Sequence, residues 1–220
     1  MPGQAEAFSD RTVEPAVHGF LHTPANPNGD GLVFTHGAGG NAKGALLVAI
    51  AEVFCDAGYF VLRCDLPFRQ NRPSGPPRPA DAKWDREGLK NAVAIMRRRL
   101  SKRLFLGGQS YGGRQATMLC ADEPELADGL LLTSYPLHPP GKREQLRTQH
   151  FPGLRTPALF VEGSKDPFAT LKEIGEALKL IPAPTRVLPF EGVGHDLGFR
   201  GKPGAESAAK ILAAFQDFFH

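Results

Sequence analysis

Cysteine is scarce in this chain of 220 residues, and its three cysteines, Cys55, Cys64 and Cys120, show no C-x-x-C spacing. An odd number of scattered cysteines predicts neither a disulfide framework nor a zinc site. The same usage favours a reducing compartment. We therefore expect a cytoplasmic protein that holds no metal ion.

The sequence also lacks a hydrophobic run long enough to cross a membrane. Its longest apolar run, residues 45–54, is short and interrupted by Glu52, whereas a spanning helix needs about 20 apolar residues. The opening MPGQAEAFSDRTVEP has neither a basic start nor an apolar core, so it is not expected to be a signal peptide. No membrane partner is predicted.

Neither sign of charge dominates, because 26 basic and 23 acidic residues give a net charge of +3 at pH 7. So small a charge does not favour nucleic acid as a partner. The densest basic cluster, residues 96–103, lies at the end of a predicted helix, where cations complement the helix dipole. The charge pattern therefore predicts a solvated surface.

Glycine and proline are plentiful, at 25 and 20 residues, and short apolar runs recur along the whole chain. Tight connections between ordered elements account for both features. The length suits a single domain, residues 1–220, and no internal repeat or linker divides it.

Predicted strands and helices alternate after a short N-terminal segment. Strands are expected at residues 31–36, 59–65, 103–109, 129–135, 157–163 and 185–192, and helices at 42–57, 81–100, 111–122, 168–180 and 204–220. Residues 66–79 read as a proline-rich loop, and a short helix is expected near 142–150. Apolar runs without alternation indicate strands covered on both faces. The fold class is therefore α/β: three layers, a mostly parallel sheet with helices on both faces, and no lid domain.

A glycine-rich turn follows the first of these strands, in GLVFTHGAGGNAKG, residues 31–44. Residues 37–42 satisfy G-x-G-x-x-G/A, a pattern that holds a dinucleotide pyrophosphate. A His-Gly-rich turn in the same position can instead donate a backbone N–H to an oxyanion during acyl transfer. Taken alone, the turn fits both interpretations.

The sequence Gly108-Gln109-Ser110-Tyr111-Gly112 matches G-x-S-x-G, and it lies between a predicted strand and a predicted helix. In this motif the serine occupies a sharp, strained turn, and the flanking glycines let the strand and helix backbones pass closely. Ser110 is therefore the predicted nucleophile, and the backbone N–H of Tyr111 is expected to face the substrate.

A nucleophilic serine needs a base and an acid that orients the base. In this architecture the chain order is serine, acid, histidine. Asp166 follows a predicted strand in LFVEGSKDPF, and His195 follows the last one in LPFEGVGHDLG. Because parallel strands end at one edge of the sheet, both residues are expected near Ser110.

Other residues compete for these roles. Glu162 is expected inside its strand, and Asp196 is adjacent to His195, so Asp166 is the favoured acid. His138 precedes the acid in the chain, which disfavours it as the base. Each favoured residue also has an ordinary alternative, because Asp166 can cap the following helix and His195 can be a simple loop residue.

With the serine motif in place, the glycine-rich turn is interpreted as an oxyanion loop. Ala38 would donate its N–H together with Tyr111, and Gly37 would let the backbone approach the substrate. The dinucleotide interpretation leaves Ser110 unexplained, but it stays as an alternative because Asp65 could bind a ribose.

These residues resemble those of the α/β-hydrolase superfamily over nearly the whole chain: Ser110, Asp166 and His195 match its nucleophile, acid and base, and HGAGG its oxyanion loop. The small size and absent lid are similar to the dienelactone-hydrolase-like branch, although that enzyme carries cysteine in place of Ser110. SYPLHPPGKREQLRTQHF and LFVEGSKDPF are similar to a group that includes testis-expressed protein thirty and a regulatory subunit of a nonspecific-lethal acetyltransferase complex. Scaffolding members of that group imply a non-catalytic binding module as an alternative function.

The expected function is hydrolysis of an ester or related acyl bond, without a cofactor, in an open site. Arg69 and Arg72 are expected to meet an anionic substrate, and His36, Gly37 and His138 are further candidate contacts. The other nearby cation, Arg114, is expected to brace neighbouring loops. Acyl transfer would use the same residues.

Overall fold

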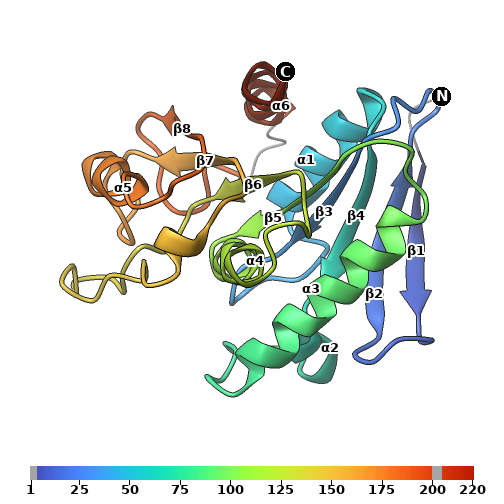
Figure 1. Cartoon of the computed structure of the whole chain (residues 1–220), viewed down its shortest axis with the longest axis horizontal. Coiled ribbons are helices and arrows are strands. Elements are labelled where there is room, and N and C mark those ends of the chain that lie inside the picture. The colour runs from blue at the N-terminus through green and yellow to red at the C-terminus, as the bar shows by residue number, and fades with distance from the viewer. Residues whose placement is uncertain (1–3, 200–204) are drawn as a thin grey trace.

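A single eight-stranded sheet organises the computed structural model, which describes residues 4–199 and 205–220 (Figure 1). The strand order is β1-β2-β4-β3-β5-β6-β7-β8. The strands are β1 (Gln4–Asp10), β2 (Val17–Thr23), β3 (Gly31–Thr35), β4 (Phe60–Asp65), β5 (Leu104–Gln109), β6 (Gly129–Thr133), β7 (Ala158–Gly163) and β8 (Thr185–Phe190).

Helices cover both faces of this sheet (Figure 1). The helices are α1 (Ala45–Asp56), α2 (Pro67–Asn71), α3 (Asp81–Arg97), α4 (Tyr111–Asp122), α5 (Leu171–Leu178) and α6 (Ala205–Phe219), with a 3-10 helix η1 (Phe151–Gly153). Buried side chains of α1 and α6 pack on one face, and those of α3, α4 and α5 on the other. This confirms the three-layer α/β architecture.

The central strands explain why the chain folds this way. Every residue of β3, β6 and β7 is buried, as their uninterrupted apolar runs predict for strands covered on both sides. The strands from β3 to β8 are all parallel. Their carboxyl ends therefore meet at one edge of the sheet, and the loops that follow them come together there.

The N-terminal segment forms two strands that the sequence interpretation missed. β1 and β2 pair antiparallel, and β2 continues the sheet antiparallel to β4. The missed signal was weak, because β1 is a mostly exposed edge strand and β2 is only partly buried. Neither contains the continuous apolar run that marked the central strands.

Two other local predictions differ from the structure. The predicted loop at residues 66–79 begins with α2, whose first residue is Pro67, a favourable residue at a helix start. The predicted helix near 142–150 is absent, and the segment forms turns instead. Its apolar residue Leu146 is 42% exposed, so a helix there would have no apolar stripe to bury. The predicted start of the last helix, at residue 204, lies outside the described residues.

The lengths and compositions of the helices bear on whether the chain can cross a membrane. None of the helices in the described ranges combines the length and the hydrophobicity that a bilayer crossing requires.

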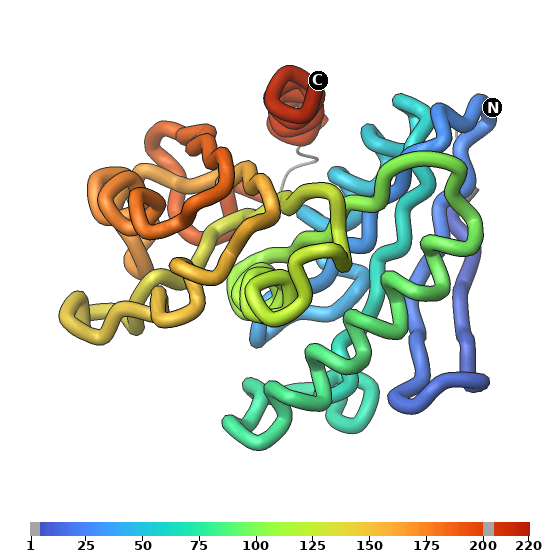
Figure 2. Tube along the Cα trace, in the orientation of Figure 1, coloured from blue at the N-terminus to red at the C-terminus, as the bar shows by residue number. Residues whose placement is uncertain are grey.

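The connection between β6 and β7 contains only turns and η1, and Figure 2 shows it as an extended loop, drawn in yellow. It is not a lid domain.

A buried histidine in β2 makes the fold sensitive to acid. His22 is 2% exposed, and its Nε2 accepts a hydrogen bond of 2.9 Å from Nε of Arg63. Burial and the charge of Arg63 lower the pKa of His22 to about 4. The unfolded chain therefore binds more protons between pH 6.5 and 4, and stability is lost as the pH falls through that window.

As the pH falls from 6.5 to 4, the free energy of unfolding should fall by about 2–3 kcal/mol more in the wild type than in the His22→Gln variant. Glutamine keeps an acceptor for Arg63 but has no proton to gain. Urea unfolding at several pH values measures the difference. Replacing the exposed His220 by glutamine is the matched control, and equal pH dependence in both variants would contradict the assignment.

Candidate active site

Ser110 lies on a sharp turn between β5 and α4. Its backbone has φ 51° and ψ −115°, a strained conformation for a residue with a side chain. A Cβ on Gly112 would lie 2.5 Å from the carbonyl oxygen of His36, and one on Gly108 2.8 Å from that of Thr35. Both positions therefore require glycine. The turn projects the serine beyond the edge of the sheet.

The structure brings Ser110, His195 and Asp166 together. Nε2 of His195 lies 2.8 Å from Oγ of Ser110, and Nδ1 of His195 lies 2.7 Å from Oδ2 of Asp166. The three residues follow β5, β8 and β7, so the parallel strands deliver them to the same edge. The imidazole is placed to take a proton from the serine while the carboxylate fixes its orientation.

Asp166 is held rigidly in this arrangement. Its side chain is fully buried, and Oδ1 accepts a hydrogen bond of 2.8 Å from the backbone N–H of Phe168. The ring of Phe168 also covers one face of His195, with a centroid separation of 4.3 Å. The competing acid Glu162 points elsewhere, because its Oε1 accepts from the N–H of Tyr135 at 2.8 Å.

The glycine-rich turn after β3 lies directly against the serine. A Cβ on Gly37 would be 3.3 Å from Cβ of Ser110. The carbonyl of Gly37 accepts hydrogen bonds from Nδ1 of His36 at 2.8 Å and from the N–H of Gly40 at 3.0 Å. In a trans peptide the next N–H, that of Ala38, points the opposite way, and Ala38 lines the cleft beside Ser110.

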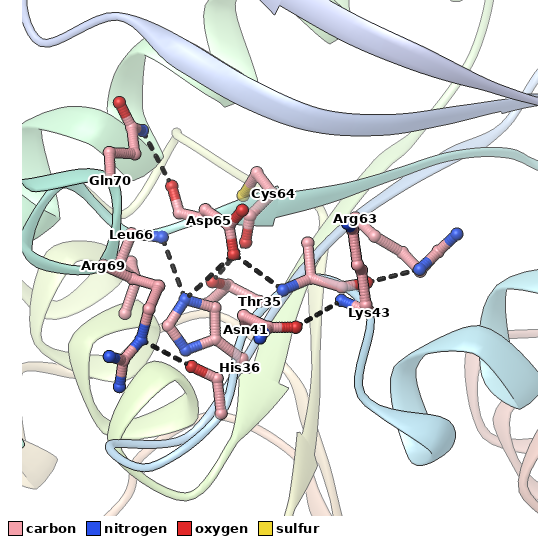
Figure 3. A network of polar contacts seen from close by, with 12 residues as sticks. Thr35, His36, Asn41, Lys43, Arg63, Cys64, Asp65, Leu66, Arg69 and Gln70 are labelled. Atoms are coloured by element: carbon pink, nitrogen blue, oxygen red, sulfur yellow. Dashed lines mark hydrogen bonds and ion pairs between the residues drawn. The ribbon is translucent and has the colours of Figure 1, made fainter. Parts of the chain in front are cut away.

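His36 is an internal brace of this turn and has no exposed surface. The N–H of Leu66 donates to Nε2 of His36 at 3.1 Å, and Asp65 lies 3.6 Å from the same nitrogen (Figure 3). Burial lowers the pKa of His36, which keeps the ring neutral with its proton on Nδ1, facing Gly37. The prediction that His36 contacts the substrate is therefore wrong, because its side chain is buried and braces the loop.

The same contacts weigh against the dinucleotide interpretation. Asp65, the acid proposed for a ribose, accepts a hydrogen bond of 2.7 Å from the N–H of Ala42 and lies against His36. Its carboxylate is thus committed to the turn. Side chains and backbone groups of the turn bind Asp65, Leu66 and Arg69, as the network of contacts in Figure 3 shows.

Arg69 also braces the turn, which corrects the expectation that it meets the substrate. The residue is 7% exposed. Its guanidinium donates to four carbonyls: those of Gly40 at 2.8 Å, Ala38 and Gly75 at 2.9 Å, and Arg72 at 3.1 Å. Arg69 does not line the cleft.

Arg72 and His138 are likewise not placed as the sequence suggested. Arg72 forms an ion pair with Asp81 at the start of α3, so its charge is already neutralised. His138 is 2% exposed, with Nδ1 2.8 Å from the carbonyl of Pro139 and Nε2 3.5 Å from Glu173. Neither residue lines the cleft.

Asp85 is a positioning residue that the sequence interpretation missed. It is fully buried in α3, where Oδ1 accepts from the N–H of Phe68 at 2.9 Å and Oδ2 accepts from the hydroxyl of Tyr111 at 2.7 Å. It thereby ties α2 and α3 to Tyr111, the residue after Ser110. Its signal was available, since Asp85 lies one turn before Gly88 and Leu89 on the apolar face of α3.

An open cleft of about 1430 Å³ lies over this edge of the sheet. Gly37, Ala38, Ser110, Tyr111 and His195 all line it. The cleft therefore gives a ligand simultaneous access to the serine, the imidazole and the glycine-rich turn.

Several solved structures share this fold. Dienelactone hydrolase from Anabaena variabilis is 21% identical, with full coverage of both chains and a TM-score of 0.75. A serine hydrolase homologue from Coxiella burnetii is 16% identical, covering 95% of this chain and 96% of the other, with a TM-score of 0.75. A serine hydrolase without a lid from Xanthomonas campestris is 13% identical, covering 99% and 96%, with a TM-score of 0.68.

The family model described as "Alpha/beta hydrolase domain" matches residues 29–219. The match spans the parallel strands, the serine turn and all the helices. The chain belongs to the alpha/beta hydrolase domain family.

Proposed function

We propose that this protein is a serine hydrolase that cleaves an ester or related acyl bond through an acyl-enzyme intermediate. The observation that carries the proposal is the continuous hydrogen-bonded series from Ser110 through His195 to Asp166, with separations of 2.8 and 2.7 Å. The open cleft lets small or accessible acyl compounds reach Ser110.

The proposed chemistry begins when Oγ of Ser110 attacks the acyl carbonyl and Nε2 of His195 takes its proton. The imidazolium then gives that proton to the leaving alcohol or amine, and the acyl group remains on the serine. Water, deprotonated by His195, cleaves the acyl-enzyme in the second half of the cycle. Asp166 keeps the proton of the neutral imidazole on Nδ1 and stabilises the imidazolium.

The proposed oxyanion hole consists of the backbone N–H groups of Ala38 and Tyr111. Tyr111 is the first residue of α4, and the first N–H groups of a helix have no partner inside it. The second donor is the N–H of Ala38. Because the carbonyl of Gly37 faces Nδ1 of His36, the N–H of Ala38 in the same peptide points away from His36. Two donors aimed at the developing negative charge would lower the barrier to attack.

Three broader assignments accompany this proposal. We propose that residues 1–220 form one domain, since both hydrophobic clusters pack on one sheet. A cytoplasmic location is supported by three cysteines that are free and buried. The resemblance to the testis-expressed protein thirty group rests on sequence motifs alone and stays a prediction.

The direct test is labelling of the folded wild type with a fluorophosphonate probe, alongside hydrolysis of short p-nitrophenyl esters. We expect turnover, and mass spectrometry should place the label on Ser110. A folded protein that neither hydrolyses the esters nor takes the label would favour the alternative, a non-catalytic binding module.

Arg69 is expected to act as a positioning residue for the oxyanion loop. Its side chain holds the carbonyls of Ala38 and Gly40, so Arg69→Ala should misplace the Ala38 N–H. Loss of one oxyanion donor typically lowers kcat by about 10²–10³-fold. We expect a fall of about 10²-fold in kcat with little change in KM, for neutral and anionic esters alike.

Two variants check this expectation. Arg69→Lys keeps some of the donors and should recover part of the lost kcat. Arg72→Ala removes the neighbouring arginine, whose ion pair with Asp81 is partly exposed, and should have a small effect. A loss confined to anionic esters would instead make Arg69 a substrate ligand.

A further inference from the structure

Three half-buried arginines from separate parts of the chain line the cleft, in addition to the exposed Arg78 and Lys83: Arg86 from α3, Arg114 from α4 and Arg147 from the connection between β6 and β7. Two adjacent side chains connect them: the Tyr135 hydroxyl lies 3.4 Å from Nε2 of His150. The charges of Arg114 and Arg86 act on the pKa of His150, and those of Arg114 and Arg147 act on the pKa of Tyr135. The chain thus concentrates positive charge beside its nucleophile.

No carboxylate of the described residues forms an ion pair with these three arginines. Arg86 donates to the neutral amide oxygen of Gln115 at 3.0 Å, and Arg147 to a backbone carbonyl at 3.3 Å. Nε of Arg114 is buried and has no hydrogen-bond partner among the residues that the structure describes.

The pKa values of neighbouring groups agree with a concentration of positive charge here. Burial and the charges of Arg114 and Arg86 lower the pKa of His150 to about 4. Burial and then Arg114 lower the pKa of the Arg147 guanidinium. Half-buried like charges repel one another, and a buried donor without a partner costs stability. An arrangement that is unfavourable in the free protein is explained if a ligand completes it.

We propose that Arg86, Arg114 and Arg147 form a subsite for an anionic oxygen group, a carboxylate or a phosphate, on the substrate that Ser110 attacks. The proposal names a substrate class and therefore rests on the serine hydrolase function proposed above. Planar guanidinium groups bind such oxyanions through paired, charge-assisted hydrogen bonds. The sequence predicted an anion contact at Arg69 and Arg72, whereas this proposal assigns that contact to Arg86, Arg114 and Arg147.

The position of Arg114 suggests how the substrate is built. Its backbone N–H donates to the carbonyl of Ser110 at 2.9 Å, so the two residues are one helical turn apart, about 5–6 Å along the axis. Met118 and Pro136 also line the cleft. The expected substrate carries its anionic group a few apolar carbons away from the acyl carbonyl.

A matched pair of substrates tests the subsite: mono-p-nitrophenyl adipate and its methyl ester. They have the same acyl chain and leaving group and differ in the terminal negative charge. We expect the wild type to favour the anionic ester in kcat/KM by about 10-fold or more at constant ionic strength. Competition by free adipate and by inorganic phosphate, with the neutral ester as substrate, then separates a carboxylate site from a phosphate site.

Single substitutions assign the preference to the arginines. In Arg114→Gln and in Arg147→Gln the ratio of the two kcat/KM values should fall about 10-fold, and Arg114→Lys should keep part of it. Arg155→Gln removes an exposed arginine outside the cleft and should keep the wild-type ratio. Circular dichroism and the melting temperature verify that each variant folds.

The outcomes distinguish this inference from the proposed function. Hydrolysis of both esters without preference, or a preference that survives both glutamine substitutions, overturns the anion subsite and leaves the hydrolase intact. If the folded wild type hydrolyses neither ester and takes no fluorophosphonate label, the hydrolase proposal fails. Calorimetric titration with adipate and phosphate then decides the subsite alone: binding that Arg114→Gln abolishes supports it, and absence of binding overturns it.

Discussion

Replacement of Ser110 by alanine is expected to lower kcat for p-nitrophenyl butyrate by about 10⁴-fold or more. The substitution removes the hydroxyl oxygen that lies 2.8 Å from Nε2 of His195 and is the proposed nucleophile. In the proposed mechanism the nucleophile, base and acid act as one unit, so loss of the serine removes the contribution of all three residues. A small residual rate should persist, since the oxyanion donors and the cleft remain.

The fold should tolerate this change. Alanine meets the same backbone strain as serine at φ 51°, and it adds no atom to the crowded turn, so the melting temperature should shift by only a few degrees. Ser101→Ala, which alters an exposed serine before β5, is the matched control and should keep wild-type activity and labelling. Activity that survives in Ser110→Ala would place the chemistry on another group.

The parts of the site that follow β-strands were within reach of the sequence. Ser110, Asp166 and His195 were placed at one edge because each follows a short apolar run, and the parallel register of β5, β7 and β8 brings them within hydrogen-bond distance. The sequence also predicted the strained serine turn from Gly108 and Gly112. The structure explains both glycines by close backbone contacts that leave no room for a Cβ. The placement of Ser110, Asp166 and His195 needed only the order of the elements along the chain and no side-chain detail.

The roles of the arginines were beyond the sequence, because they depend on which tertiary partner each one meets. Arg69 follows a strand in a predicted loop and suggested a substrate contact. In the structure it lies in α2, and four carbonyls surround it, two of them from the distant glycine-rich turn. Arg114 suggested a brace, yet it lines the cleft without a counter-ion among the described residues. Spacing along the chain predicts where a side chain begins and does not predict what it meets.

Asp166→Asn is expected to reduce kcat by about 10⁴-fold while leaving the geometry almost unchanged. The reason lies in the hydrogen bond that Phe168 donates to Oδ1 of Asp166 at 2.8 Å. In the variant this N–H selects the amide oxygen, so the amide nitrogen turns toward Nδ1 of His195 and donates to it. The proton of the neutral ring is then driven to Nε2, where it blocks transfer from Ser110.

The neighbouring acid provides the matched control for this argument. Glu162 is 1% exposed, and burial raises its pKa well above the ordinary range despite the hydrogen bond from Tyr135. Burial favours the neutral form of its carboxyl. Glutamine resembles that form in shape and charge, so kcat of Glu162→Gln should stay within a few-fold of the wild type. The reverse pattern, with Asp166→Asn active and Glu162→Gln inactive, would transfer the orienting role to Glu162. Because both carboxyls are buried beside β7, the contrast between the variants depends on which one reaches the imidazole, and the 2.7 Å contact belongs to Asp166.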